Sequence, residues 1–307
     1  MNKLLTTYLK YLGIDKLPKN FEKYLKSPTL LRLKNVGYLC GMDYASKDIY
    51  DFKEKITRYD HSLTSLLMTW KLKQDKTESL AALYHDAATP CFSHVIDYMN
   101  KDYEKQESTE EYLNKIIYND EYLINCFKKD NINVDDIINF KKYKIVDNNR
   151  PKSCVDRIDG VILTGISWTK NIEENDIKSI VSDIKLFINE DNEEEIGFSN
   201  EEVVKKVIEV SNSIDLACHS YTDNYMMELL AKITRISIEK KYIKYDDLYY
   251  LNEKELFKIL NSIHNLELSI LLYIFKNVKK KDIPHFELPN VKIRKLSPLL
   301  NGKRYNH

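Results

Sequence analysis

The stretch Arg58-Tyr59-Asp60-His61-Ser62-Leu63 lies within the segment that decides the fold, residues 49–74. Apolar side chains recur in this segment at spacings of three and four residues, namely Ile56, Tyr59, Leu63, Leu66, Leu67 and Trp70. Because such spacing gathers them on one side of a helix, the pattern predicts an amphipathic helix over residues 49–74. His61 therefore belongs to a helix with an apolar face.

Helical periodicity continues along most of the chain and predicts a mostly α-helical fold. Further helices are expected at residues 77–85, 93–99, 109–128, 133–142, 153–165, 199–218, 222–240, 246–250 and 253–261. Ser93 is the expected N-cap of the helix over 93–99. The pattern of apolar and polar residues changes near residue 166, which favours a helical segment 1–165 followed by a mixed segment 166–307.

Strand patterns are confined to the second segment. Residues 182–189 alternate as a strand does, and residues 291–294 are a second strand candidate. The acidic stretch from Glu190 to Glu195 is expected to be a solvated turn between strands rather than a metal site.

Composition limits the class of protein. The chain has 307 residues, with 47 Lys plus Arg and 47 Asp plus Glu, so its net charge is zero. No global field would attract it to nucleic acid or to an anionic membrane. No apolar run approaches the roughly 18–20 residues of a membrane span, and residues 1–3 lead into no signal core. Five scattered cysteines without a C-x-x-C pair favour reduced thiols in a cytoplasm.

Histidines and aspartates recur on successive predicted helices. His85-Asp86 follows His61 by 24 residues, and Asp156 comes 70 residues after Asp86. Two adjacent residues cannot share a face in mid-helix, but at a helix end both can turn toward one ion, and Pro90 marks such an end. Imidazole with carboxylate suits a divalent cation such as Mn, Fe, Co, Ni, Zn or Mg. Taken singly, His61 could equally be a hydrogen-bonded core histidine, and Asp156 a carboxylate on a helix surface.

This order of residues resembles the HD-domain metal-dependent phosphohydrolases, and within them the branch of the dNTP triphosphohydrolases. Four strings carry the likeness: Ser-Pro-Thr-Leu-Leu-Arg-Leu-Lys at 27–34, residues 58–63, the stretch from His85-Asp86 to Phe92-Ser93-His94, and Val-Asp-Arg-Ile-Asp at 155–159. The segment from His219 to Leu230 resembles the helix that follows in these proteins. The likeness is specific for residues 27–165 and weaker for residues 166–307.

The resemblance implies an HD-domain helical bundle with a smaller mixed α+β C-terminal part, and a homo-oligomer. It places four residues on a divalent metal ion: His61, His85, Asp86 and Asp156. It also places Arg58 and Arg157 against the substrate phosphates, where a guanidinium can bind two oxygens at once. A salt bridge to a neighbouring helix is the alternative for Arg58. His94 would lie in the active-site pocket as a proton donor or phosphate ligand.

Three positions depart from that branch: Thr89 replaces a second histidine, Gly160 a tyrosine that contacts the nucleotide, and Thr164 an aspartate that reads the sugar. We therefore hypothesise metal-dependent hydrolysis of a nucleotide or a related phosphoester or phosphoanhydride. The expected catalytic residues are Asp86, Thr89 and His94. Asp159 is expected to orient Arg157 or to cap a helix.

Two other classes stay open. One is a regulatory protein that binds nucleotide or metal with little turnover, which the three departures favour. The other is a protein whose metal only cross-links its helices. A nucleic-acid partner has little support, because the sequence holds no basic stripe interleaved with aromatic residues.

Overall fold

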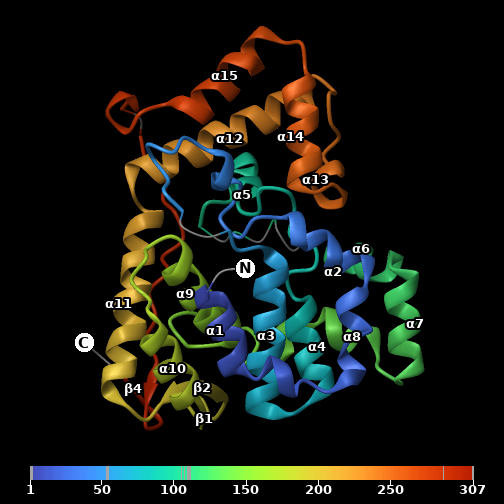
Figure 1. The fold of residues 1–307 in the computed structure, drawn as a ribbon, viewed down its shortest axis with the longest axis vertical. Coiled ribbons are helices and arrows are strands. Elements are labelled where there is room, and N and C mark those ends of the chain that lie inside the picture. The colour runs from blue at the N-terminus through green and yellow to red at the C-terminus, as the bar shows by residue number, and fades with distance from the viewer. Residues whose placement is uncertain are drawn as a thin grey trace.

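The computed structural model describes residues 3–52, 55–104, 106, 108, 112–285 and 287–305. Helices dominate this part of the chain, so the prediction of a mostly α-helical fold is confirmed (Figure 1). The α-helices are α1 (Lys3–Leu12), α2 (Pro28–Arg32), α3 (Arg58–Lys73), α4 (Lys76–Tyr84), α5 (Val95–Asn100), α6 (Leu113–Asn119), α7 (Glu121–Lys129), α8 (Val134–Ile138), α9 (Val155–Ser167), α10 (Glu174–Asp183), α11 (Glu201–Cys218), α12 (Tyr221–Glu239), α13 (Asp247–Tyr250), α14 (Glu253–Ser262) and α15 (Leu266–Asn277). None of the described helices is long and apolar enough to cross a membrane.

A small mixed sheet lies at one end of the molecule. Its strands are β1 (Lys185–Ile188), β2 (Glu194–Phe198), β3 (Leu299–Leu300) and β4 (Lys303–Arg304), in the order β1-β2-β3-β4. β1 pairs antiparallel with β2, β2 parallel with β3, and β3 antiparallel with β4. The strand predicted at 182–189 is confirmed for residues 185–188, whereas residues 182 and 183 belong to α10. The solvated turn expected from Glu190 to Glu195 is confirmed only for residues 190–193, because Glu194 and Glu195 begin β2 and the Glu195 side chain is completely buried.

The second strand candidate, residues 291–294, is wrong, because its backbone groups bond to partners outside any sheet. The Lys292 amide donates to the carbonyl of Tyr103 at 3.0 Å. The Arg294 amide donates to Asp215 Oδ1 at 2.6 Å. The segment is extended, but it runs across the helices rather than beside a strand.

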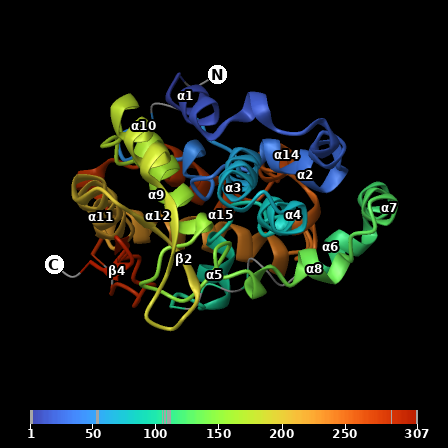
Figure 2. The same ribbon diagram turned by 90° about the horizontal axis from the view of Figure 1, so that it is seen from below.

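The core is continuous from the first helices to the last. α3 packs against α4 and α9, α9 packs against α11, and α12 packs against α5 and α15. Viewed from below, α3 and α4 lie side by side, with α9 and α11 to one side of them (Figure 2). The buried cluster joins Leu66 of α3 with Ile162 of α9 and Val207 of α11. The division near residue 165 thus stays an interpretation of the sequence.

The helix predicted over 49–74 begins nine residues late, at Arg58. The Asp60 amide donates to Thr57 Oγ1, and the Thr57 amide donates to Asp60 Oδ2, which forms a capping box. Residues 56 and 57 are instead extended, since the Tyr38 amide donates to the Ile56 carbonyl and Thr57 pairs with Gly37 in a short β-bridge. Residues 53 and 54 lie outside the described part of the chain.

Three other boundaries differ from the prediction. The helix expected over 109–128 is divided into α6 and α7. Asp120 follows the end of α6, and its carboxylate accepts a hydrogen bond from the Leu123 amide and so caps the start of α7. Residues 109–111 lie outside the described residues. The helix over 133–142 divides into α8 and a 3-10 turn. Ser93 does not cap α5, because its hydroxyl accepts a hydrogen bond from Arg58 Nε instead.

Candidate metal centre

Four donor groups from three helices converge on one point. α3 supplies His61, the end of α4 supplies His85 and the turn after it Asp86, and α9 supplies Asp156. His61 Nε2 lies 3.2 Å from both His85 Nε2 and Asp156 Oδ1. Asp86 lies 3.7 Å from His61 Nε2 through Oδ2 and 3.8 Å from His85 Nε2 through Oδ1. Ligands held about 2.0–2.2 Å from one ion are separated by such distances.

The hydrogen bonds of the two imidazoles engage Nδ1 and leave Nε2 available to bind a metal ion. His61 Nδ1 donates to Asp159 Oδ2 at 2.7 Å, and His85 Nδ1 donates to the Ala82 carbonyl at 2.7 Å. With the proton on Nδ1, each Nε2 carries its lone pair toward the other three donors. A carboxylate or carbonyl behind the outer nitrogen is the arrangement that orients metal-binding histidines. The residues present therefore fit a divalent ion.

Asp159 is the residue behind His61, and its predicted role was wrong. Its buried carboxylate accepts from Tyr8 Oη at 2.6 Å and from Thr64 Oγ1 at 2.9 Å, in addition to His61. It makes no hydrogen bond to Arg157 among the described residues. The spacing of three residues from Asp156 on one helix is the sequence signal that could have placed both acids on the same face.

The carboxylates give the centre a strong preference for positive charge. Burial opposes the ionised form of Asp86, but the neighbouring His85 and Arg58 charges lower the pKa of Asp86 to about 2. Burial likewise opposes a charged His61, yet hydrogen bonds to Asp156 and Asp159 raise the pKa of His61 to about 10. A divalent cation would satisfy the same negative potential.

The two arginines predicted to face phosphates have different surroundings. Arg58 Nη1 donates to Asp86 Oδ2 at 2.7 Å, and the guanidinium carbon lies 4.9 Å from the centre of the Tyr38 ring. Arg157 donates instead to the loop before it, to Asp147 Oδ1, to the side chain and carbonyl of Asn148, and to the Lys152 carbonyl. The structure thus uses Arg58 to hold Asp86 and Arg157 to order that loop; contact with a phosphate stays a prediction for both.

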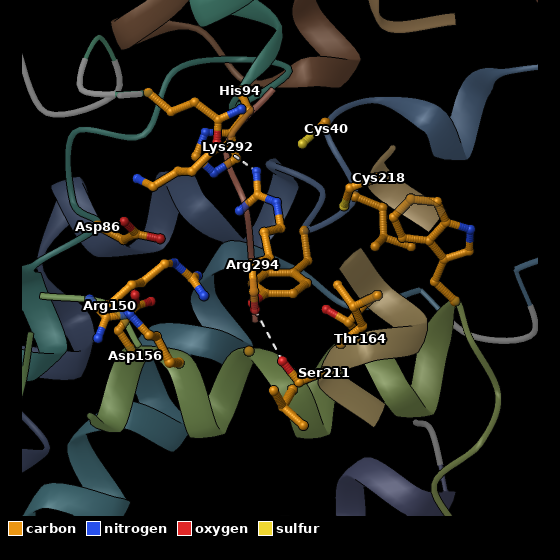
Figure 3. Close-up of a pocket in the computed structure, with 18 of the residues that line it drawn as sticks. Cys40, Asp86, His94, Arg150, Asp156, Thr164, Ser211, Cys218, Lys292 and Arg294 are labelled. Atoms are coloured by element: carbon orange, nitrogen blue, oxygen red, sulfur yellow. Dashed lines mark hydrogen bonds between the residues drawn. The ribbon is translucent and has the colours of Figure 1, made fainter. Parts of the chain in front are cut away.

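A cavity of about 520 Å³ opens beside the four donors. One part of its wall is basic, with Arg150 near Asp156, and with Lys292 and Arg294 reaching in from the C-terminal segment (Figure 3). Another part is aromatic and apolar, with the side chains of Tyr38, Tyr50, Phe52, Trp168, Ile214 and Met227. The cavity combines residues from both sides of position 165.

Arg150 and Arg294 are basic residues of this wall that the sequence analysis missed. Arg150 forms no hydrogen bond or ion pair within the described chain, and burial together with the Arg294 charge lowers its pKa to about 10. Arg294 Nη2 donates to the neutral Gln106 Oε1 at 2.5 Å, while its carbonyl accepts from Ser211 Oγ at 3.0 Å. The alternation of Lys292 and Arg294 was visible as a strand pattern, and in the extended segment it sends both side chains to the same cavity.

His94 lines the cavity, whereas Thr89 is not among the lining residues. His94 Nδ1 donates to the buried Asp97 Oδ2 at 2.8 Å, and burial lowers the pKa of the imidazole. Thr89 is buried, and its carbonyl accepts from Arg32 at 2.6 Å. The structure therefore brings His94 into the cavity that His85, Asp86 and Asp156 line, and it leaves Thr89 outside the wall.

Two of the departures also line the cavity, namely Gly160 and Thr164. A Cβ on Gly160 would lie 3.1 Å from Tyr38 Oη, so a phenol from another segment occupies the space beside this glycine. The Tyr38 ring also lies 5.2 Å from the His61 ring, centre to centre. The cavity thus has a tyrosine near the donors even though position 160 lacks one.

Comparison with known proteins shows a distant likeness to one bacterial protein. No family model matches the chain. The chain is 26% identical over 139 residues to the uncharacterized protein YdhJ of Bacillus subtilis (strain 168). The match covers 45% of the chain and 41% of the relative, so the chain spans less than half of that protein's length. Membership of the HD-domain phosphohydrolases therefore stays a prediction.

Proposed function

We propose that this protein is a metal-dependent phosphohydrolase of the HD-domain type that acts on a nucleotide or a related phosphoester or phosphoanhydride. The observation that carries the proposal is the convergence of two Nε2 atoms and two carboxylates beside a cavity that His85, Asp86 and Asp156 line. Two arginines of the same wall, Arg150 and Arg294, form no ion pair with a carboxylate within the described chain. Metal donors beside anion-binding groups are what hydrolysis of a phosphate ester requires.

Four residues would hold the ion: His61, His85, Asp86 and Asp156. When bound, a divalent ion supplies Lewis-acid polarisation of a phosphoryl oxygen and lowers the pKa of a bound water to about 7. Asp159 keeps the His61 imidazole in the tautomer that leaves Nε2 available, and Arg58 fixes the position of the Asp86 carboxylate.

Arg150 and Arg294 are the groups best placed to bind phosphoryl oxygens. Each is a planar cation facing the cavity, and within the described chain neither side chain forms an ion pair with a carboxylate. Guanidinium groups of this kind bind phosphate oxygens through paired hydrogen bonds and stabilise the charge that develops during transfer. Lys292, from the same extended segment as Arg294, adds a third positive charge.

His94 is the candidate for proton transfer. Because Nδ1 donates to Asp97, Nε2 carries a lone pair, and burial keeps the ring neutral near neutral pH. Nε2 would accept a proton, and the buried carboxylate would stabilise the resulting imidazolium, which can then donate to the leaving oxygen.

The aromatic part of the wall favours a substrate with an organic group over inorganic polyphosphate. Trp168, Phe52 and Tyr50 pack against one another, with ring centres of the successive pairs 5.1 to 6.4 Å apart. Flat apolar faces of this kind accept a nucleobase, which stacks on an aromatic ring.

The test combines metal analysis with a product screen over dNTPs, NTPs, cyclic nucleotides, guanosine tetraphosphate and a chromogenic phosphodiester, each with Mn, Mg, Co and Ni. We expect His85→Ala to lose bound metal and turnover together. The matched control is His264→Ala, which changes an exposed histidine outside the cavity. Turnover that persists in metal-free His85→Ala protein would refute the proposal.

Two further outcomes distinguish the alternatives. Bound metal and tight nucleotide binding without any product would identify a regulatory protein. A large fall in melting temperature with a chelator, without turnover on any substrate, would identify a metal that only cross-links α3, α4 and α9.

A further inference from the structure

A second group of oxygen atoms meets outside the cavity, beside Gly37. Asp43 and Tyr44 come from the 3-10 turn Met42–Tyr44, and Glu253 is the first residue of α14. Within the part of the chain that the structure describes, four buried side-chain oxygens here have no hydrogen-bond partner: Asp43 Oδ2, Tyr44 Oη, and both Oε1 and Oε2 of Glu253. Glu253 itself is completely buried. Buried polar atoms without partners are rare in folded proteins and call for an explanation.

The two carboxylates face the same small space. A Cβ on Gly37 would lie 2.7 Å from Asp43 Oδ2 and 3.0 Å from Glu253 Oε2. The absence of a side chain at position 37 is therefore what lets both acids approach from separate elements. The amides of Gly37 and Phe92 face Glu253 and lower its pKa, but neither reaches hydrogen-bonding geometry.

No neighbouring cation forms an ion pair with either acid within the described chain, although Lys47 is near enough to lower the pKa of Asp43. Lys55 is near enough to lower the pKa of both, but its Nζ lies over the Tyr44 ring, 5.3 Å from the centre, and it forms no ion pair with either carboxylate. Arg32 donates instead to the carbonyls of Leu251, Ala87 and Thr89. Burial and the Asp43 charge raise the pKa of Glu253 to about 7. Two carboxylates whose facing oxygen atoms are buried without an ion-pair partner are strongly unfavourable when both are ionised.

We propose that Asp43, Tyr44 and Glu253 form a second cation site, which takes a hard divalent ion of the Mg²⁺ or Ca²⁺ class. The donors are all oxygen atoms, which such ions prefer, whereas the candidate metal centre offers two imidazoles. Carboxylates from two elements supply the charge that a divalent ion balances.

The position of the site gives the ion a structural consequence. Gly37 pairs with Thr57 in a short β-bridge, directly before α3 begins. The Gly37 carbonyl also accepts from Ser93 Oγ, which in turn accepts from Arg58 Nε. An ion bound to Asp43 and Glu253 would therefore tie α14 to the segment that positions the start of α3.

The test uses the full chain with His85→Ala as the background, so that the candidate metal centre does not contribute. After removal of ions with a chelator, the melting temperature is followed during titration with MgCl₂ or CaCl₂, with NaCl as the ionic-strength control. We expect one of the two ions to raise it by roughly 5 °C at a concentration about 100 times the dissociation constant. Addition of Glu253→Gln should abolish this rise. Addition of Glu267→Gln, an exposed acid in the first turn of α15, should leave it intact.

Direct ion counting covers the case in which Glu253→Gln does not fold. Elemental analysis should then find one equivalent of the ion in His85→Ala protein and none after addition of Asp43→Asn. Equal binding with and without Asp43→Asn would overturn the proposal. A melting temperature that changes with pH but with neither ion would show that the two acids share a proton, and it would overturn the proposal as well.

Discussion

The hydrogen bond between Asp159 and His61 gives the sharpest test of how the metal centre is built. Asp159→Asn keeps the shape of the side chain but removes the charge that faces Nδ1 of His61. A hydrogen bond to a charged group contributes about 1.5–3 kcal/mol, against about 0.5–1.5 kcal/mol for a neutral pair. The difference of about 1–1.5 kcal/mol corresponds to roughly a tenfold loss of metal affinity. Loss of basicity at the imidazole extends the expected range to roughly 10- to 100-fold.

The matched control for Asp159→Asn is Tyr8→Phe. It removes a second hydrogen bond to the same buried carboxylate, at 2.6 Å, but leaves the contact with His61 in place. Competition between the protein and a chromophoric chelator for Mn²⁺ or Co²⁺ measures both affinities, and circular dichroism checks that each variant is folded. We expect Tyr8→Phe to bind metal within about threefold of the unmodified chain. Equal affinities of the Asp159→Asn variant and the unmodified chain would refute the assignment of Asp159 as the residue that orients His61.

Three further predictions concern the cavity and the fold. Arg150→Met should raise the KM for a phosphorylated substrate by roughly tenfold or more, because it removes a cation without an ion-pair partner in the described chain. Lys295→Met changes an exposed lysine and should leave the KM unchanged. Steady-state kinetics compares the two variants. Burial raises the pKa of Asp223 to about 7, so the folded chain keeps a proton that the unfolded chain releases from about pH 4 upward. The free energy of unfolding should therefore fall as the pH rises between these two values. Asp223→Asn should make this fall less steep in urea unfolding measured from pH 4.5 to 8. Gly41→Ala should cost about 2–3 kcal/mol in the same assay, because Gly41 has φ near 75° and a Cβ there would lie 2.6 Å from Phe92 Cδ1; a loss below about 0.5 kcal/mol would contradict the steric argument.

Local signals in the sequence predicted the long helices well. The periodic pattern at 153–165 and 222–240 corresponds to α9 and α12 within two residues at each end. The predicted start of α3 was wrong because the apolar spacing was followed back through residues 49–57. Thr57 and Asp60 have the spacing of a capping box, which marks the true start. A cap satisfies the unpaired amides of the first turn, so it decides the boundary where periodicity alone is ambiguous.

The candidate centre was predictable only as far as residue chemistry goes. Residue type and spacing pointed to His61, His85, Asp86 and Asp156 as candidates, and the resemblance to the HD-domain proteins assigned these four to one ion. The basic wall could not be found in this way, because Arg150 and Arg294 belong to a loop and to an extended segment without periodicity, and they meet only through tertiary packing. The partner of Asp159 was misjudged, since a helix position fixes the face of a side chain and not the group that it contacts.

The charges around the cavity bear on the kind of anion that it would accept. In two ion pairs the charges of arginine and aspartate cancel, namely in Arg58 with Asp86 and in Arg157 with Asp147. A divalent ion at the four donors would offset the negative charges of Asp156 and of Asp159, whose carboxylate bonds to His61. The positive charges of Arg150 and Arg294 then lie at the cavity wall in addition to this balance. A single phosphoryl group brings about −1.5 to −2 charges, which these two arginines can balance. The charges of the cavity wall therefore fit one phosphoryl group beside the metal centre, whether it belongs to a monoester or ends a longer phosphate chain.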